Sequence, residues 1–385
     1  MEEIGSEHII PLEEPTAPKR TRLQEFWLVF RENRLAIAGM CIFLLFFSTA
    51  LAGLFLTSGT SPILDPSMVR LEEKLKPPLA RPNLRTLRPE EVPALGMYPF
   101  GTDDLGRDIF ARMLQGAWVS LTVGFVAVGI SVLVGIFMGG IAGFYGQRSI
   151  RLGHLTWIVL FLSGGILAVQ TSAAAGIVMI VAAAAVAVLT YRYDARNPSP
   201  KWMSALGIPT FKMDTLIMRL VDIMLCFPSF FLILTVVALL PASIYNIMIV
   251  IGLTSWMGTT RFVRAEFLSL REQDFVMAAR ALGIDHFRII FRHMMPNAIA
   301  PVLVSATIGI ASAILTEAGL SFLGFGVPPP HATWGNILSD GKRFIIDAPW
   351  LTFIPGIAIL VVVLSFNLFG EGLRDVLNPK LRERH

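Results

Sequence analysis

Long runs of apolar residues constrain this sequence more than any other feature. Six runs are long enough to cross a membrane as helices, at residues 35–56, 117–143, 216–240, 244–260, 298–324 and 351–370. A bilayer core about 30 Å thick needs roughly 20 apolar residues of helix, because every backbone polar group must be paired within the span. The sequence is 54% hydrophobic and only 16% charged, whereas soluble domains are about 25% charged. We therefore expect an all-α integral membrane protein.

A seventh apolar stretch, at residues 155–193, is too long for one ordinary span and short for two. Basic residues precede and follow it, so the positive-inside rule places both of its ends in the cytoplasm. We interpret it as a transmembrane hairpin that turns near residues 170–172, within an inserted segment at 147–211. This gives eight spans. A re-entrant pair is the alternative, and a single tilted span would move everything after it to the opposite face.

The basic residues also predict the orientation. Residues 1–34 include five Lys or Arg side chains and form a cytoplasmic segment, too long and too polar to resemble a signal peptide. The loop at 57–116 is then extracytoplasmic and leads to the second core helix at 117–146. The remaining core helices lie within 212–372, with a cytoplasmic loop at 261–297, and residues 373–385 form a cytoplasmic tail. We expect a multi-pass protein of the bacterial inner membrane with both termini inside.

The extracytoplasmic loop ends in GTDDLGRDIFARMLQGAW, which predicts an interfacial helix. Thr102 is a suitable N-cap, and Asp103 and Asp104 would occupy the first turn, at the positive end of the helix dipole. One face of that helix would carry Leu105, Ile109, Met113 and Ala117. A substrate gate or a partner-docking helix is the alternative role.

Residues 275–297, FVMAARALGIDHFRIIFRHMMPN, place charged side chains between two apolar runs and predict two short helices. Asp274 is a suitable cap for a helix at 275–282, and Gly283 suits the left-handed residue that often follows a helix. Asp285 would cap the second helix, and Pro296 would end it. An amphipathic stripe on this second helix would consist of Phe287, Ile290, Phe291 and Met294.

The first of these helices is short enough to need support from a partner or from the rest of the protein. Ala278 and Ala279 have almost no side chain, which suits a backbone that inserts into a cleft of another protein. Packing on the cytoplasmic face of this same chain is the alternative, and the periodicity does not separate the two.

AARALG followed by RHMMPN resembles the cytoplasmic coupling loop of bacterial ABC-importer permeases. Its pattern is Glu-Ala-Ala, three residues, Gly, nine residues, Ile, one residue, Leu-Pro, and the matching positions are Ala278, Ala279, Gly283 and Pro296. Met277, His293 and Met295 replace the glutamate, isoleucine and leucine. The segments YPFGTDDLGRDIFARMLQGAWVSL, MRLVDIMLCFPSF, LTEAGLSFLGFGV, WGNILSDGKRF and FNLFGEGLRDVLNP resemble the second permease subunit of the dipeptide, oligopeptide and nickel branch.

The resemblance implies a type I ABC-importer permease fold with six core helices, to which this sequence adds the apolar hairpin. It also implies a homologous permease partner, two cytoplasmic ATPase subunits that hold ATP and Mg²⁺, and an extracytoplasmic solute-binding protein. No cofactor and no metal are expected in this chain. The residues implied in ATPase coupling are Asp274, Met277, Ala278, Ala279, Arg280, Gly283, Asp285 and Pro296. Glu272 and Asp274 are candidates for the carboxylate that Met277 lacks.

Three ionisable residues fall within the predicted spans, where a charge costs about 2.5–3.5 kcal/mol at the helix centre. Glu317 could line the translocation path or bond to neighbouring helices, and we favour the second role. Arg219 and Asp222 are three residues apart and are expected to pair with each other at the membrane edge.

Other functions find little support in the sequence. The segment GNILSDGKR, at 335–343, lacks the spacing and the Ser or Thr of a nucleotide-binding loop, and no HExxH or GxSxG motif is present. An ATPase-independent secondary transporter or channel is the main alternative, but it predicts broken, repeated halves and leaves the coupling loop without a role. A membrane-bound enzyme ranks third. Dipeptides, oligopeptides, glutathione and nickel chelates all fit as substrates.

Overall fold

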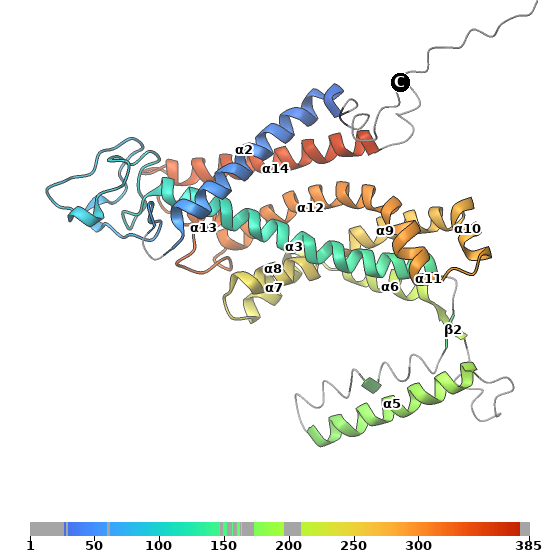
Figure 1. The fold of residues 1–385 in the computed structure, drawn as a ribbon. Helices are drawn as coiled ribbons and strands as arrows, with labels where there is room; N and C mark the ends of the chain where they lie inside the picture. Colours follow the sequence, from blue (N-terminus) through green and yellow to red (C-terminus); the bar gives the residue numbers. More distant parts are fainter. Residues whose placement is uncertain are drawn as a thin grey trace, which may run out of the picture.

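A computed structural model describes residues 27, 30–59, 62–146, 149–151, 156, 160–161, 163, 173–195 and 209–377. The regular structure of the described chain is helical apart from two short strands, and a long, mostly irregular loop joins α2 to α3 (Figure 1). The longest helices are α2 (Arg34–Thr57), α3 (Ile109–Tyr145), α12 (Met295–Phe322) and α14 (Trp350–Leu377). The others are α5 (Ala173–Ala195), α6 (Met213–Cys226), α7 (Ser229–Leu239), α8 (Ile244–Leu253), α9 (Trp256–Arg271), α10 (Asp274–Ala281), α11 (His286–Arg288) and α13 (Trp334–Gly341).

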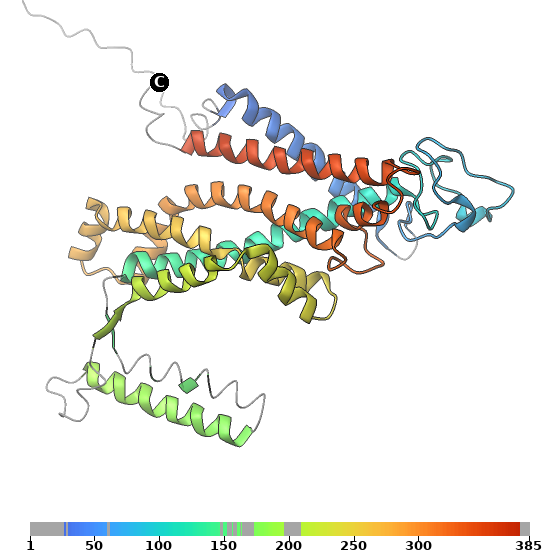
Figure 2. The ribbon, with the colours of Figure 1, turned by 180° about the vertical axis from the view of Figure 1, so that it is seen from behind.

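Helix α3 lies at the centre of the bundle and packs against α2, α8, α9 and α12, while α14 lies between α2 and α12 (Figures 1 and 2). The most extensive of these contacts is with α9. Gly135, Gly139 and Gly143 line that contact, and a Cβ atom at Gly139 would lie 2.7 Å from the carbonyl oxygen of Thr260. The four-residue glycine spacing thus lets two backbones meet in the bundle.

The third and fourth apolar runs are not the continuous helices that we predicted. Between α6 and α7 the chain bends by 82°, at Phe227 and Pro228. Pro228 has no N–H to donate and disfavours helical geometry at the residue before it, and Phe227 is extended with ψ 132°. Helix α8 ends before Thr254 and Ser255, whose hydroxyls donate to the carbonyl oxygens of Val250 and Ile251.

Four helices of the described chain are long and apolar enough to cross a membrane, or five if the bent pair forms one span. They are Arg34–Thr57, Ile109–Tyr145, His286–Phe322 and Trp350–Leu377, with Met213–Cys226 and Ser229–Leu239 as the bent pair. The all-α membrane architecture is confirmed. The run that we predicted as one further span is divided between helix α8 and the start of helix α9.

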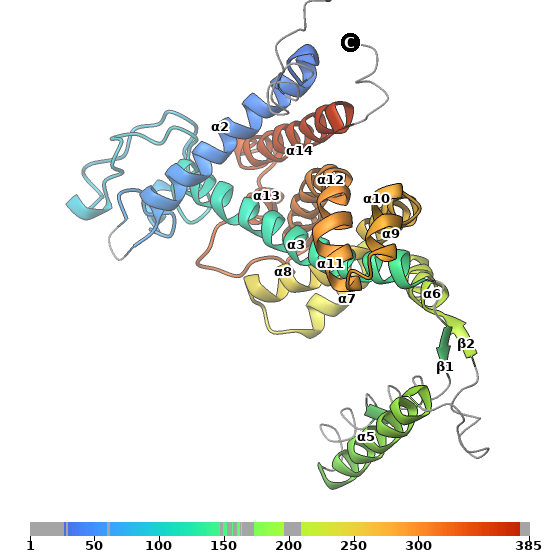
Figure 3. The same ribbon diagram turned by 45° about the vertical axis from the view of Figure 1, so that its right-hand side comes forward.

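The inserted segment leaves the bundle and returns at one place. Strand β1 (Ser149–Arg151) pairs antiparallel with β2 (Pro209–Lys212), so the two ends of the insertion lie side by side. Helix α5 lies apart from the other helices in all three ribbon views (Figure 3). The predicted turn at 170–172 lies outside the described residues, and the eight-span count stays a prediction.

The predicted helix before the second span begins at Ile109 and not after Thr102. Ile109, Met113 and Ala117 of the predicted face are buried, and Leu105 lies before the helix. Thr102 forms a β-bridge with Asp108 instead of a cap, and its hydroxyl donates to the carbonyl oxygen of Glu73. Asp108 is the true N-cap of α3, since its carboxylate accepts from the backbone N–H of Phe110 at 2.9 Å. The Asp103 side chain turns inward and binds arginines, so the chain between Thr102 and Asp108 forms a tight turn. Helix α3 then continues into the second span without a break.

Candidate functional site

The coupling segment, residues 272–294, lies at the opposite end of the bundle from the loop before α3 (Figure 1). Helix α9 leads into α10 and α11, followed by a π-helical turn, Ile289–Met294, which joins α12. The segment rests on a hydrophobic cluster formed by Phe144, Val263, Phe267, Leu270, Val276, Ala279, Ile289, Met294, Ala298 and Val302. It is therefore a packed extension of the bundle with its own small core.

Helix α10 matches the predicted first helix closely, with one correction at its start. Its N-cap is Gln273, which makes no side-chain cap hydrogen bond, and Asp274 is the first helical residue. A carboxylate in the first turn still faces the positive end of the helix dipole. The helix ends as predicted, because Gly283 has a left-handed φ of 70° and its N–H bonds to the carbonyl oxygen of Arg280.

The second helix begins as predicted but continues differently. The Asp285 carboxylate accepts from the N–H of Phe287 at 2.9 Å and caps α11. Pro296 does not end the helix, because it occupies one of the first two positions of α12, where a missing N–H breaks no hydrogen bond.

The predicted amphipathic stripe of this second helix is only half confirmed. Met294 is fully buried and Ile290 packs against the hydrophobic cluster, but Phe287 and Phe291 are 67% and 53% exposed, with ring centroids 4.4 Å apart. Ile289, which the stripe left out, is fully buried together with Met294. They are five residues apart, the spacing that a π turn places on one face, whereas the prediction assumed α-helical spacing.

Aromatic contacts attach the coupling segment to the end of α3. The guanidinium of Arg280 lies 5.1 Å from the ring centroid of Phe144, a cation–π distance. The ring of His286 meets Phe144 and Tyr145 edge-on, at 5.4 and 5.8 Å between centroids. Helices α10 and α11 are thus both in direct contact with the end of α3.

One side of α10 faces away from the protein, and we call it the docking surface. Val276 and Ala279 point into the cluster beneath, whereas Leu282 is 80% exposed. The docking surface consists of Asp274, Phe275, Met277, Ala278 and Leu282. The two alanines thus differ: Ala279 packs inward and Ala278 faces outward.

The carboxylates that could replace the family glutamate lie beside α10. The Glu272 carboxylate is 3.0 Å from the guanidinium of Arg271, the last residue of α9. Asp274 is exposed on the docking surface. Met277 itself is 48% exposed, so its position is available to a partner although its side chain carries no charge.

Glu317 is fully buried and bonds to other helices. Its carboxylate accepts from Ser321 at 2.6 Å and from Ser120 of α3 at 3.4 Å. The Ser120 hydroxyl also accepts from the backbone N–H of Trp334 in α13. These bonds join α12, α3 and α13, and the geometry supports the helix-packing interpretation of Glu317.

The predicted pair between Arg219 and Asp222 does not form. Asp222 accepts instead from Arg261 of α9 at 2.8 Å. A second pair of the same kind lies nearby, in which Arg264 of α9 donates two hydrogen bonds to Asp214 of α6. The two pairs link α6 to α9, and helix spacing within one element could not have identified them because 39 and 50 residues separate the partners.

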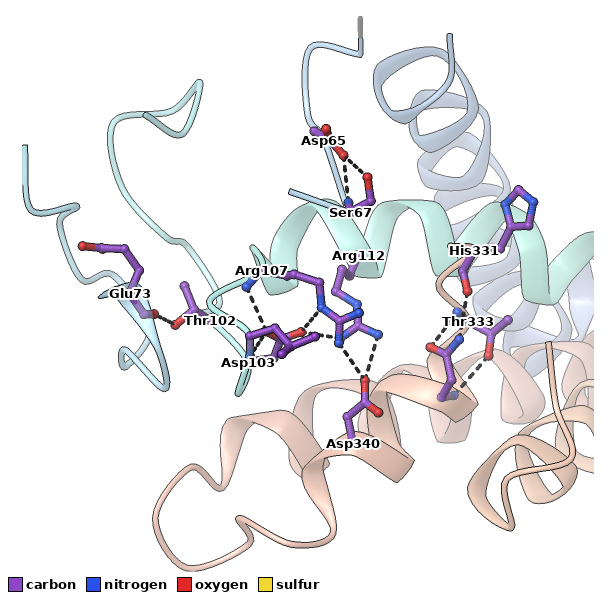
Figure 4. A network of polar contacts seen from close by, with 12 residues as sticks. Asp65, Ser67, Glu73, Thr102, Asp103, Arg107, Arg112, His331, Thr333 and Asp340 are labelled. Atoms are coloured by element: carbon purple, nitrogen blue, oxygen red, sulfur yellow. Dashed lines mark hydrogen bonds and ion pairs between the residues drawn. The ribbon is translucent and has the colours of Figure 1, made fainter. Parts of the chain in front are cut away.

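A buried ion cluster at the other end of the molecule was missed by the sequence reasoning (Figure 4). Arg112 lies at the start of α3 with its side chain only 4% exposed, between Asp103 at 2.5 Å and Asp340 of α13 at 2.9 Å. Arg107 binds the same two carboxylates at 2.6 and 3.2 Å. No pairing signal for this cluster is present in the sequence, because 228 residues separate Arg112 from Asp340.

Comparison with known families agrees with this architecture. Residues 204–383 match the family described as binding-protein-dependent transport system inner membrane component. Residues 21–78 match the N-terminal transmembrane domain of oligopeptide transport permease C.

Known relatives resemble nearly the whole chain. The dipeptide transport system permease protein DppC of Alkalihalophilus pseudofirmus is 35% identical over 98% of this chain and 100% of its own length. DppC of Haemophilus influenzae is 33% identical over 95% of this chain and 97% of its own length. The oligopeptide transport system permease protein OppC of Bacillus subtilis is 31% identical over 92% and 89%. The chain therefore belongs to the family of inner membrane components of binding-protein-dependent transport systems, and it is a multi-pass permease subunit of an ABC importer.

Proposed function

We propose that this permease carries dipeptides or oligopeptides across a bacterial inner membrane. It forms one half of the translocation path, and a homologous permease forms the other. Two cytoplasmic ATPase subunits, which hold ATP and Mg²⁺, drive transport, and an extracytoplasmic binding protein delivers the substrate. No cofactor is assigned to this chain. The names of the relatives support the substrate class, since they are permeases of dipeptide and oligopeptide transport systems.

One observation carries the ATPase-coupling part of this proposal. Helix α10 has only eight residues, and a helix of that length is marginal without packing. It is held from one side by the hydrophobic cluster and by the Arg280–Phe144 contact, while Met277, Ala278 and Leu282 face outward. A short rigid helix with an uncovered apolar side suits a site where a partner subunit pushes on the bundle.

The distribution of charge supports a cytoplasmic position for the docking surface. Helices α9 to α11 and the π turn carry six arginines, and positive residues favour the cytoplasmic side; these are Arg261, Arg264, Arg271, Arg280, Arg288 and Arg292. The start of α2 and the end of α14 lie together, because Asn33 donates to Asp375 at 3.0 Å. Both lie at the same end as α10 (Figure 2), which supports cytoplasmic termini.

Site-directed crosslinking tests the docking surface. Cys41 and Cys226 are exposed and would be replaced by serine before a single cysteine is added. In the assembled complex, Met277→Cys should crosslink to an ATPase subunit, whereas Leu95→Cys, which is half-exposed in the loop before α3, should not. A crosslink from position 95 and none from position 277 would reverse the orientation.

Reconstitution tests transport itself. The purified complex of both permeases and both ATPases, placed in vesicles with the binding protein, should accumulate labelled dipeptide when ATP is supplied. Accumulation by the permeases alone would instead indicate a secondary transporter or channel.

A further inference from the structure

A small pocket between α3, α8, α9 and α12 has an unusual lining. Its volume is about 150 Å³, and half of its twelve lining residues carry a hydroxyl group: Ser131, Ser255, Thr259, Ser305, Ser312 and Thr316. None of the described residues that line it is charged. The pocket therefore offers hydrogen bonds without a preference for either sign of charge.

Four of these hydroxyls, those of Ser131, Thr259, Ser305 and Ser312, make no hydrogen bond to the described part of the chain. Ser131 and Thr259 are only 4% and 5% exposed, and both line the pocket. Their oxygens are not among the fully buried atoms that lack a hydrogen-bond partner, so they keep accessible surface in the pocket. Thr316 and Ser255, by contrast, donate to the carbonyl oxygens of Ser312 and Ile251. The hydroxyl groups of Ser131 and Thr259 are therefore positioned to form hydrogen bonds with a molecule that enters the pocket.

The pocket continues along one face of α12 into a larger apolar pocket. Ser305, Gly309, Ser312 and Thr316 follow the four- and three-residue spacing of a single helix face. Thr316 also lines the second pocket, of about 530 Å³, together with Phe230, Gly319, Phe322, Leu338 and Ile359. Together the two reach the size of common ligand pockets, roughly 300–1,000 Å³.

We propose that these two pockets are this chain's share of the peptide path, in which the hydroxyls bind peptide main-chain groups and the apolar pocket receives a side chain. This inference rests on the proposed function. A hydroxyl both donates and accepts, so it can bond to the C=O and the N–H that every peptide carries. An uncharged lining does not reject acidic or basic side chains, as a path for peptides of varied sequence requires.

A steric block tests the assignment without disturbing this chain. A Cβ atom at Gly258, in the pocket lining, would meet no atom within 4 Å, so Gly258→Leu projects into open space. Gly129→Leu is the matched control, since Gly129 is also helical and equally open but lines neither pocket. In the reconstituted complex, Gly258→Leu should lower dipeptide uptake by at least about tenfold, while Gly129→Leu should leave it unchanged.

Removing the hydroxyls gives a milder and more specific change. Ser131→Ala with Thr259→Val should reduce uptake by about two- to tenfold, the effect of losing one or two hydrogen bonds. Ser312 is exposed, so a longer side chain has room there. Ser312→Asp should slow a glutamate-containing dipeptide more than a lysine-containing one, and Ser312→Lys should do the reverse, a reversal that a purely structural role would not produce.

Each outcome decides between the claims. If the unmodified complex takes up no dipeptide, the proposed function fails before the path is tested. If it transports and Gly258→Leu transports equally well, the path assignment is overturned. If Gly258→Leu prevents the two permeases from assembling, the partner permease fills the pocket, and the assignment is overturned as well.

Discussion

The two ends of the bundle are built on different physical principles. At the end that we propose lies outside the membrane, here called the outer end, Arg112 is buried between Asp103 and Asp340 and fixes the loop, α3 and α13 to one another. At the coupling end, α10 rests on apolar side chains and leaves Met277 and Leu282 exposed. Buried ions must be satisfied within the chain that buries them, since an unpaired buried charge costs several kcal/mol. An exposed apolar surface is satisfied when another protein covers it.

The charges of the Arg112 cluster are therefore paired within this chain, whereas under the proposed function a partner covers the apolar surface of the coupling end. This contrast predicts that substitutions at the outer end change stability and that substitutions at the coupling end change transport. Both ends offer positions at which the contrast can be tested with matched variants.

The largest effect on transport is expected from Gly283→Arg at the coupling end. Gly283 and Gly324 both have a left-handed φ, 70° and 89°, and both have open space around the Cβ position. Arginine at either position carries a similar backbone strain of about 1–3 kcal/mol. Gly283→Arg should lower ATP-driven uptake by at least about tenfold, the equivalent of about 1.4 kcal/mol, because it obstructs the docking surface.

Gly324→Arg is the control, since Gly324 follows α12 at the outer end. It should show a similar loss of thermal stability in detergent and much higher uptake than Gly283→Arg. Equal uptake by the two variants would show that strain, and not position, determines transport.

At the outer end, Asp103→Ala should cost about 3–5 kcal/mol of folding free energy, the range for breaking a buried ion pair. Asp103 is fully buried, and its carboxylate also accepts from the N–H groups of Leu105 and Arg107 at 2.9 and 2.8 Å. The measurement is the melting temperature of the purified protein. A melting temperature equal to that of the unmodified protein would show that the cluster is dispensable.

The sequence predicted the parts of this molecule that depend on local pattern. Apolar length identified α2, α3, α12 and α14, and glycine chemistry identified the left-handed residue after α10. The cap at Asp285 followed in the same way, because its hydrogen bond to Phe287 spans only two residues. Such features are determined by a few neighbouring residues, so a single sequence contains them.

Features that depend on distant residues were not predictable. Asp222 binds Arg261, not the nearby Arg219, because α9 lies beside α6 in the bundle. Thr102 looked like a cap, but its hydroxyl bonds to Glu73, 29 residues away. The π turn at Ile289–Met294 changes which residues share a face, and α-helical spacing cannot reveal it.

A smaller effect at the outer end depends on pH. Burial raises the pKa of the Asp108 carboxyl to about 6, although the hydrogen bond from Phe110 opposes the shift. The folded state therefore favours the protonated form, and this contribution to stability is present below about pH 4 and lost as the pH rises through about 6. A shift of this size corresponds to at most about 3 kcal/mol.

Asp108→Asn removes the charge and keeps an effective cap. Its melting temperature should fall less than that of the unmodified protein between pH 4 and pH 7. If the melting temperatures of the two proteins fell by the same amount across this range, the assignment of the shift to Asp108 would be contradicted.

The smallest effect should come from Asp222→Ala, near the coupling end. Asp222 and Arg261 are each about half exposed, at 49% and 53% of their side chains. Exposed pairs of this kind contribute about 0–1 kcal/mol, because water screens the charges and the side chains lose entropy when they pair. The melting temperature should therefore change far less than for Asp103→Ala, although both substitutions remove an aspartate bound to arginine. Equal losses would mean that exposure does not separate the two ends, and that the coupling end depends on its own ion pairs as strongly as the outer end does.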